Sequence, residues 1–404
     1  KQKRLAIEQT EKMASSAMRV LAFAQKEIGK EKNAMEKAEE GMVFLGLQGM
    51  IDPPRDEVQG ALNTCRQAGI RAIMLTGDNK STAQAIASKV GFTGMAIDAK
   101  ELSTLSPQQF EDAVFKYDVF SRVSPEQKLE VLRVLKKRGL SVAMTGDGVN
   151  DAPALKQADV GIAMGIRGSD VAKETSDIVL LDDNFATIVE AIREGRGVFE
   201  NIRKFALYLL ASNVAEVFVV FIASIAGSLP ITAVQLLFVN LLTDGMPALA
   251  LGADPPRPGI MLEKPRKSSK GIIDAQTASL LLLMGLTSTI IILALFFTYL
   301  PQGLGLAQTV VFSCFIIFEF TKLVVIRQKD GLGMASNKWL LAALFGSILI
   351  LLAIMYTPAA GLFGVVRLSP IEWGMIVLGG IVAYGANTIG TKIILRKVPS
   401  GTVS

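Results

Sequence analysis

The sequence predicts an α/β domain built around a parallel sheet, followed by an all-α bundle of six membrane-spanning helices. Half of the 404 residues are apolar, and the charged residues, 20% of the chain, are concentrated before Lys204. The first half alternates short apolar segments with amphipathic ones, the pattern of strands and helices in succession. The second half contains apolar runs of about 20 residues, the length that crosses a bilayer. We therefore expect a water-soluble half and a membrane half.

The composition excludes several classes of chemistry. The chain contains no histidine, which rules out a Ser/His/Asp triad, a histidine-bound zinc site and imidazole acid–base catalysis. Cys65 and Cys314 lie in segments of opposite character, so neither a disulfide framework nor a thiolate metal site is expected. The net charge of +5 is small, and basic residues cluster beside apolar runs. The lipid bilayer is thus the expected partner, and nucleic acid is not.

The α/β half is predicted from alternating elements. Segment 81–90 has the spacing of an amphipathic helix, and four short apolar segments are typical of strands: 71–75, 141–144, 160–164 and 177–181. Two of these strands lead into Thr-Gly-Asp turns, at 76–78 and 145–147. The carboxyl ends of parallel strands form the ligand-binding edge of such a sheet, so both turns are expected at that edge.

The residues that follow these two strands suit phosphoryl transfer. Asp147 and Asp151 flank a glycine-containing turn, so their oxygens can converge on Mg²⁺, which takes one or two carboxylates and keeps water and phosphate as further ligands. Thr76 and the amide of Gly77 can donate hydrogen bonds to phosphoryl oxygens. Lys128, which lies between the two turns in the sequence, can supply the positive charge that stabilises the transferring group.

The membrane half is predicted to contain six helices. The predicted spans are 205–227, 231–252, 277–300, 306–326, 338–357 and 371–394. The pattern of a helix over 184–204 continues into the first span, with Gly195 and Gly197 as points where it can bend. Lysine and arginine near span ends stay cytoplasmic, and here they lie almost entirely after the second and fourth spans and in the C-terminal tail. The soluble half and the C-terminus are therefore predicted to be cytoplasmic.

Acidic side chains occur within the predicted spans. Glu216 and Asp244 lie in the first two spans, which contain no lysine or arginine, and a charge in hydrocarbon costs at least a few kcal/mol. Asn213 shares a helical face with Glu216, and Asn240 and Thr243 share one with Asp244. This set offers only oxygen ligands, as Ca²⁺ and other hard cations require. It predicts a cation site between the two spans.

Neighbouring residues refine this site and leave two alternatives open. Gly245 and Pro247 weaken the helix directly after Asp244, which can free backbone carbonyls beside the ion. Thr243 can instead bond to a carbonyl of its own helix. Glu319, in the fourth span, is a further candidate ligand, but Lys322 lies one turn away and can simply pair with it.

Three motifs carry a resemblance to a known family. The run TGDGVNDAPAL at 145–155 resembles the hinge signature of P-type ATPases, whose phosphorylation domain has the haloacid-dehalogenase fold with a Rossmann-like parallel sheet. MLTGD at 74–78 resembles the partner motif, and VNLLTDG at 239–245 resembles a cation-binding helix of the type II calcium pumps. The resemblance covers essentially the whole chain. It implies the C-terminal remnant of a nucleotide-binding domain at 1–42, a phosphorylation domain at 43–183, a stalk helix at 184–204, transmembrane helices at 205–397 and a tail at 398–404.

The resemblance also implies roles for individual residues. It implies Mg²⁺ coordination or site organisation for Asp147, Asn150 and Asp151. It implies phosphate contacts for Thr76, Gly77 and Lys128, with Asp78 in the same catalytic motif, and nucleotide contacts for Arg19 and Arg122. The implied Ca²⁺ ligands are Asn213, Glu216, Asn240, Thr243, Asp244 and Glu319. This ligand set resembles that of the two-ion reticulum pumps more than that of the single-ion plasma-membrane pumps.

The implied activity is ATP-driven export of Ca²⁺ from the cytosol through an aspartyl-phosphate intermediate, with H⁺ counter-transport, across the cell membrane or an intracellular store membrane. The family's phosphorylated aspartate lies in an Asp-Lys-Thr-Gly run, and this sequence contains none. We therefore expect the C-terminal part of a pump, which needs its N-terminal part as a partner and is inactive alone. Two alternatives are a type II pump for Na⁺, K⁺ or H⁺ and a non-catalytic membrane subunit whose phosphatase-like domain only binds Mg²⁺ or nucleotide.

Overall fold

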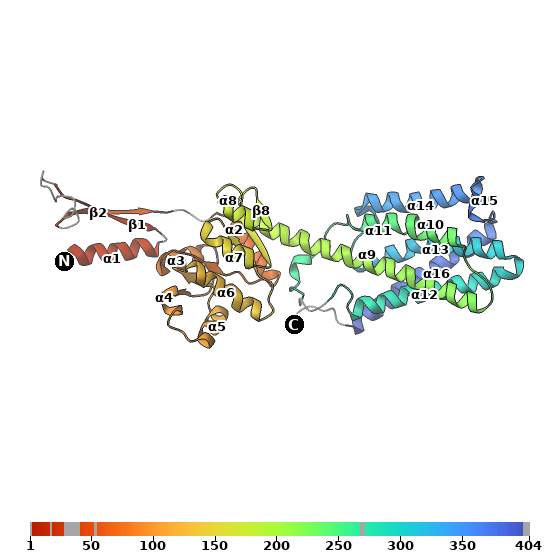
Figure 1. The fold of residues 1–404 in the computed structure, drawn as a ribbon, viewed down its shortest axis with the longest axis horizontal. Helices are drawn as coiled ribbons and strands as arrows, with labels where there is room; N and C mark the ends of the chain where they lie inside the picture. The colour runs from red at the N-terminus through yellow and green to blue at the C-terminus, as the bar shows by residue number, and fades with distance from the viewer. Residues whose placement is uncertain (1, 17, 28–40, 52–54, 267–270, 399–404) are drawn as a thin grey trace. The chain divides into compact units, whose positions relative to one another are not determined.

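The computed structural model describes residues 2–16, 18–27, 41–51, 55–266 and 271–398. The chain divides into two compact units, Lys1–Ala191 and Ile192–Ser404. The first unit mixes strands and helices, and the second consists of helices (Figure 1). This order of elements confirms the predicted fold class, a parallel α/β domain followed by an all-α bundle.

The α/β unit begins with a helix and an antiparallel pair of strands. Helix α1 (Gln2–Ser15) precedes strand β1 (Arg19–Gln25), which pairs with β2 (Val43–Met50). These two strands form a sheet of their own, separate from the parallel strands that follow. Several of their large apolar side chains are exposed, among them Phe23 and Phe44.

The parallel strands form two three-stranded sheets instead of the one sheet that the sequence predicted. The first sheet has the order β3 (Met74–Leu75), β5 (Val119–Ser121), β4 (Ala96–Asp98). The second has the order β6 (Ala143–Gly146), β7 (Val160–Met164), β8 (Ile178–Leu180). The sequence analysis predicted no strand at the positions of β4 and β5.

Helices flank both faces of the first parallel sheet. Adjacent residues of a strand point to opposite faces, and Val119 of β5 packs with Ala83 of α3, whereas Phe120 packs with Ala113 of α5. The helices of this unit are α2 (Glu57–Gln67), α3 (Lys80–Lys89), α4 (Ala99–Leu102), α5 (Pro107–Lys116), α6 (Pro125–Lys137), α7 (Ala152–Gln157) and α8 (Asp170–Thr175). Helix α3 therefore starts directly after the first Thr-Gly-Asp turn, and α6 starts shortly after β5.

A single long helix contains both the predicted stalk and the first predicted span. Helix α9 (Phe185–Ile225) has 41 residues and is about 60 Å long at 1.5 Å per residue. Gly195 and Gly197 lie inside it. A Cβ atom at Gly197 would come within 2.8 Å of Cγ of Pro256, so the glycine lets the segment after the second span lie directly against α9.

The second predicted span is interrupted at its centre. It consists of α10 (Ala233–Phe238), a π-helical turn (Val239–Thr243) and α11 (Gly245–Leu251). The amide of Asp244 donates to the carbonyl of Val239, five residues back, at 2.9 Å. Pro247 has no N–H to donate to the carbonyl four residues earlier, so the regular pattern cannot run through this point. The expected weakening of the helix near Gly245 and Pro247 is thus present.

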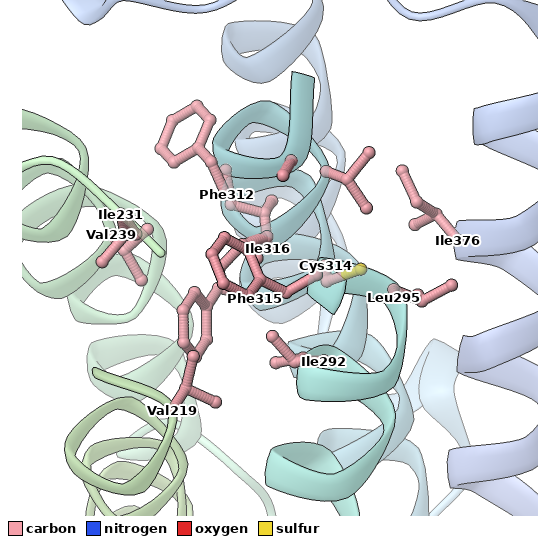
Figure 2. Close-up of a cluster of buried hydrophobic side chains, with 14 of the residues drawn as sticks. Val219, Ile231, Val239, Ile292, Leu295, Phe312, Cys314, Phe315, Ile316 and Ile376 are labelled. Atoms are coloured by element: carbon pink, nitrogen blue, oxygen red, sulfur yellow. The ribbon is translucent and has the colours of Figure 1, made fainter. Parts of the chain in front are cut away.

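The remaining spans pack around one central helix. The other elements of the helical unit are α12 (Ala275–Tyr299), α13 (Leu304–Lys329), α14 (Lys338–Tyr356), α15 (Ala360–Phe363) and α16 (Pro370–Lys397), with 3-10 turns at Ile260–Leu262, Leu300–Gln302 and Met334–Ser336. Phe312, Phe315 and Ile316 of α13 belong to a cluster that also includes Val219 of α9 and Ile292 of α12 (Figure 2). Within the described residues, six helical segments are long and apolar enough to cross a membrane.

Candidate functional site

The first Thr-Gly-Asp turn is fixed to the exit of the neighbouring strand. Thr76 follows β3, its amide donates to the carbonyl of Phe120 at 2.9 Å, and its carbonyl accepts from the amide of Val123 at 3.0 Å. The amide of Asp78 donates to Oγ1 of Thr76 at 3.1 Å, so the turn is closed by its own side chain. Gly77, at its tip, is exposed and a Cβ there would meet nothing within 4 Å. The tip of this turn is therefore open to solvent.

Lys128 is brought to the second turn by the start of α6. Ser124 caps this helix by accepting from the amide of Gln127, and Pro125 occupies the first helical position. One turn further on, Nζ of Lys128 lies 2.6 Å from Oδ1 of Asp151, with side chains 14% and 10% exposed. The structure thus joins two of the residues that the sequence predicted for phosphate chemistry.

The second turn holds one engaged and one free carboxylate. Besides its pairing with Lys128, Asp151 accepts from the amide of Gly148 at Oδ2, at 3.3 Å. A Cβ at Gly146 would lie 2.5 Å from Cβ of Asp151, so glycine is required at that position. Asp147 is held by its backbone, whose carbonyl accepts from the amide of Ser169 at 2.8 Å, while its side chain is exposed.

In this turn, the exposed carboxylate of Asp147 is accessible to a ligand, whereas the carboxylate of Asp151 positions Lys128. Asn150 is exposed beside them. The part of the chain that the structure describes contains no group of three or more acidic, histidine or cysteine side chains that could hold a metal ion. Mg²⁺ does not need such a group, because one or two carboxylates together with phosphate oxygens and water satisfy it.

Arg19 and Arg122 are the two residues predicted to bind the nucleotide. No contact among the described residues brings either of them to the second turn. Arg122 is exposed, has a positive φ of 55° and lies 3.9 Å from Oδ2 of Asp98. Its amide donates to the carbonyl of Asp78, which explains the unusual backbone angle as part of the turn at 76–78. Arg19 begins β1, and its side chain lies outside the described residues. Their nucleotide contacts stay predictions.

In the helical unit, the first two spans meet at Glu216 and Asn240. Nδ2 of Asn240 donates to Oε2 of Glu216 at 2.8 Å and to the carbonyl of Leu236 at 3.1 Å. The side chain of Glu216 is buried, and its other oxygen, Oε1, has no hydrogen-bond partner among the described residues. One carboxylate oxygen of this buried acid is therefore available to a ligand.

Asp244 is the least satisfied acid of the unit. It is 1% exposed, and neither of its carboxylate oxygens has a hydrogen-bond partner within the described part of the chain. It lies within electrostatic range of Glu216 and Glu319. A buried carboxylate without partners is strongly unfavourable unless a cation neutralises it, so these orphaned oxygens fit a hard cation such as Ca²⁺.

Two of the predicted ion ligands, Thr243 and Glu319, make the contacts that the sequence analysis gave as alternatives to ion binding. Oγ1 of Thr243 bonds to the carbonyl of Val239 in its own helix at 3.0 Å. Oε1 of Glu319 accepts from Nζ of Lys322 at 2.8 Å, and the pair is almost fully buried. The expectation that the acids of the first two spans lack a basic neighbour needs correction, because the charge of Lys322, on the fourth span, also reaches Glu216 and Asp244.

Ser212 and Asn213 are adjacent polar residues on α9, and the sequence predicted only Asn213 as a site residue. Asn213 is exposed, and no hydrogen bond of its side chain occurs among the described residues. Its neighbour Ser212 is 1% exposed, and its Oγ lies 2.9 Å from both Oε1 of Glu319 and Nζ of Lys322. Two adjacent polar residues on a helix differ by about 100° in direction, and only the packing partners decide which one faces the bundle.

Two family models match the chain. The model described as haloacid dehalogenase-like hydrolase matches residues 6–159, and the model described as cation transporting ATPase, C-terminus, matches residues 228–393. The first covers the α/β unit from within α1 to the end of α7, with both Thr-Gly-Asp turns, and the second covers the bundle from the end of the first span onward. Together the two models match parts of both units of the chain.

Curated relatives resemble the chain along most of its length. A calcium-transporting ATPase of Bacillus subtilis is 43% identical over 397 residues, which are 95% of this chain and 44% of the relative. A cation-transporting ATPase of Synechocystis is 41% identical over 344 residues, 82% of this chain and 38% of the relative. An endoplasmic reticulum-type calcium-transporting ATPase of Arabidopsis thaliana is 38% identical over 405 residues, 89% of this chain and 40% of the relative.

The chain belongs to the P-type cation-transporting ATPase family, and its apolar helices make it a multi-pass membrane protein. It spans less than half the length of these relatives.

Proposed function

We propose that this chain is the ion-binding and phosphate-binding part of an ATP-driven Ca²⁺ pump that exports Ca²⁺ from the cytosol through an aspartyl-phosphate. One observation carries the proposal: Glu216 and Asp244, buried in apolar spans, have three carboxylate oxygens without a partner among the described residues. Such oxygens suit a hard divalent cation. The printed names of the relatives from Bacillus subtilis and Arabidopsis thaliana support calcium as that ion.

In the α/β unit, we assign phosphate binding to the two strand-end turns. The exposed amide of Gly77 and the hydroxyl of Thr76 donate to phosphoryl oxygens, and Lys128 contributes positive charge, held in place by Asp151. Asp147, with Asn150 beside it, would hold Mg²⁺, which neutralises the phosphate charge that develops during transfer. Arg19 and Arg122 are assigned to the nucleotide, as the family resemblance implies.

Helix α9 is the proposed mechanical link. It is continuous from Phe185, at the end of the α/β elements, to beyond Glu216, so a displacement of its first turns moves the ion ligand as part of one hydrogen-bonded rod. After the ion leaves, the carboxylates of the site repel one another, and protons that replace the ion would be carried back. The positive charges of the loops support a cytosolic position for the α/β unit and the C-terminus.

The test is transport by the full-length pump that contains this chain, purified and reconstituted into vesicles. ATP-dependent uptake of ⁴⁵Ca²⁺ is expected, and Glu216→Gln should lower the apparent Ca²⁺ affinity about tenfold or more, the worth of one contact to a charged group. Glu194→Gln is the matched control, since it makes the same change on an exposed residue of the same helix. Uptake with the same Ca²⁺ affinity in both variants would remove the assigned site.

A pump for another cation is the second candidate, and two observations favour it. The ligand set contains only oxygen donors, which do not by themselves select one hard cation, and the relative from Synechocystis is described only as cation-transporting. ATPase activity of the same reconstituted protein, measured with Ca²⁺, Na⁺, K⁺ and H⁺ in turn, separates the two. Stimulation by a monovalent ion without stimulation by Ca²⁺ would establish this candidate. No stimulation by any ion would favour a non-catalytic membrane subunit.

A further inference from the structure

We infer that α12, α13 and α16 enclose a hydration site, in which ordered water pairs the side chain of Asn387 with hydroxyl groups of the same interface. The residues of this site belong neither to the proposed ion site nor to the phosphate-binding turns. Their side chains are uncharged, so water at this place does not depend on which ion the pump carries.

Asn387 of α16 is a fully buried amide without a hydrogen-bond partner. It is 0% exposed, and neither its Oδ1 nor its Nδ2 has a partner among the described residues. Gln235, another fully buried amide of the helical unit, is paired at both ends: Nε2 donates to the carbonyl of Phe363 at 2.9 Å, and Oε1 accepts from the amide of Thr232 at 3.1 Å. Buried polar groups in proteins are normally paired, so Asn387 needs a partner that is not a residue of the described chain.

Three hydroxyl groups of the same two helices are unpaired as well. A hydroxyl in a helix can pair with the backbone carbonyl four residues back. Five buried hydroxyls of the helical unit do so, those of Ser212, Thr289, Thr309, Ser313 and Ser347. The buried hydroxyl oxygens of Ser288 on α12 and of Thr388 and Thr391 on α16 have no partner in the described part of the chain. These hydroxyls are therefore available to a ligand.

Close contacts on either side place the unpaired groups in one stretch of the interface between α12 and α16. A Cβ atom at Gly390 would lie 2.5 Å from Cδ2 of Leu283, and one at Gly379 would lie 3.1 Å from Cγ2 of Ile291. The two helices are thus antiparallel and in close contact at both of these levels. The stretch between the levels contains the unpaired amide on α16 and Ser288 on α12.

Helix α13 covers the third side of this stretch. A Cβ at Gly380 would lie 3.8 Å from Cγ2 of both Ile317 and Thr321, and Oη of Tyr384 lies 3.1 Å from Oε1 of Gln328, so α13 and α16 run side by side. Because Asn387 is 0% exposed, this chain itself encloses it. A segment outside this chain therefore cannot reach the amide and supply the missing partner.

Water is the ligand that fits this set of groups. One amide and three hydroxyls offer no counter-charge to an ion. Nδ2 of Asn387 only donates hydrogen bonds and Oδ1 only accepts them, whereas water does both. Buried waters in proteins typically make about three hydrogen bonds to polar groups that otherwise have no partner, and fully apolar cavities stay dry.

The experiment is radiolytic hydroxyl labelling of the purified full-length pump, read by mass spectrometry. Radicals formed from a bound water oxidise the side chains beside it, even where bulk solvent has no access. Met284 is the probe, because it lies one turn before Ser288 on the same face of α12 and is 0% exposed. Met355 of α14 is the matched control, because it is 1% exposed and belongs to an apolar cluster.

Met284 is expected to be oxidised about tenfold or more faster than Met355, because an apolar cluster holds no water. Equal, slow oxidation of the two methionines would show that the interface is dry and would overturn the inference. Neither outcome bears on the proposed function, because Ca²⁺ binding and transport are not measured.

A substitution identifies the groups that hold the water. Asn387→Leu replaces the amide by an apolar side chain of similar size, and it should lower the oxidation rate of Met284 about threefold or more while leaving Met355 unchanged. Water at the proposed ion site would remain in this variant, so an unchanged rate at Met284 would overturn the inference. Ser288→Ala gives the same readout if Asn387→Leu does not fold, with the same expected direction and the same contradicting outcome.

Discussion

Two acids of the helical unit, ten positions apart, are buried to nearly the same degree but use their oxygens differently. Asp254 is 5% exposed and Asp244 is 1% exposed. Each carboxylate oxygen of Asp254 has a partner, whereas neither oxygen of Asp244 has one among the described residues. Lys204 and Arg327 supply the counter-charges of Asp254, and we propose that a bound cation supplies that of Asp244. The two acids therefore differ in whether their oxygens have hydrogen-bond partners in the protein, and not in how deeply they are buried.

Asp254 ties together three helices. Its Oδ2 lies 3.3 Å from Nζ of Lys204 on α9 and 3.1 Å from Nε of Arg327 on α13. Its Oδ1 accepts at 2.7 Å from Nδ2 of Asn337, the residue that caps α14. The backbone carbonyl of Asp254 accepts from Asn201 at 2.7 Å. All of these side chains are buried, so the cluster fixes the segment after α11 to the bundle.

The α/β unit repeats this contrast within one turn. Asp151 is engaged at both oxygens, by Lys128 and by the amide of Gly148, whereas the side chain of Asp147 is exposed. Asp151 positions Lys128, and the exposed Asp147 is the acid that we propose to hold Mg²⁺. In both units, therefore, one acid is held by partners in the protein (Asp151, Asp254), and a second acid close to it in the sequence is not held in this way by the described residues (Asp147, Asp244).

The largest effect is expected for Asp254→Asn. This substitution leaves Arg327 buried without a counter-charge among the described residues, which costs about 3–5 kcal/mol, while Lys204 keeps Asp330 at 3.9 Å. The melting temperature of the full-length pump in detergent should fall sharply, and Glu194→Gln, an exposed change of the same type, should leave it unaltered. If the Asp254→Asn variant melted at the same temperature as wild type, the hydrogen-bonded carboxylate of Asp254 would not stabilise the bundle.

Asp244→Asn is expected to do the reverse. Its oxygens have no partner among the described residues to lose, so the melting temperature in the absence of Ca²⁺ should stay the same or rise. Ca²⁺ affinity should fall about 100-fold, which corresponds to about 2.7 kcal/mol. Equilibrium binding and thermal melting of one preparation measure both quantities. A variant that loses stability and keeps its Ca²⁺ affinity would contradict the contrast with Asp254.

A smaller effect is expected for Asn240→Ala. The amide orients Glu216 through a 2.8 Å hydrogen bond to Oε2, and hydrogen bonds to charged groups are worth about 1.5–3 kcal/mol. Some of that energy is recovered when the carboxylate turns toward the ion, so Ca²⁺ affinity should fall about tenfold. Asn213→Ala, which changes an exposed asparagine of the neighbouring helix, is the matched control and should have little effect. Equal losses in both variants would place Asn213 in the site as well.

Much of this arrangement could be predicted from the sequence because it depends on local pattern. Apolar length located the membrane spans, and the Thr-Gly-Asp turns located the phosphate edge at the ends of β3 and β6. Gly245 and Pro247 indicated the interruption of the second span, which the structure shows as a π-helical turn.

The partners of the buried acids could not be predicted in the same way. Lys204 and Arg327 lie 50 and 73 residues from Asp254, and Ser212 lies 110 residues from Lys322. Helical periodicity describes which residues share a face, but it does not say which helix that face meets. The pair of Glu319 and Lys322 was foreseen as an alternative because its members lie on one turn, whereas the hydrogen bonds of both to Ser212 depend on packing against α9.

The smallest effect concerns Asp183, an acid that backbone amides satisfy instead of cations. Its oxygens accept from the amides of Ile166 and Arg167 at 3.0 and 2.9 Å. Burial raises the pKa of Asp183, but these amide donors outweigh it, so the folded-state pKa lies below the ordinary 3.8. A lowered folded-state pKa stabilises the protein above the unfolded value, and this stability is lost as pH falls through the folded value.

Asp183→Asn should therefore lower the melting temperature at neutral pH, and by less than Asp254→Asn does. Asparagine tolerates the positive φ of 50° at this position, so the substitution changes charge and hydrogen bonding without new backbone strain. The difference from wild type should stay constant at neutral and mildly acidic pH and shrink as pH falls below about 3.8, where the wild-type carboxylate takes up a proton. Melting curves of both proteins across this range measure the difference. If the difference in melting temperature stayed the same at the lowest pH, the shape of the Asp183 side chain, and not its charge, would account for its contribution to stability.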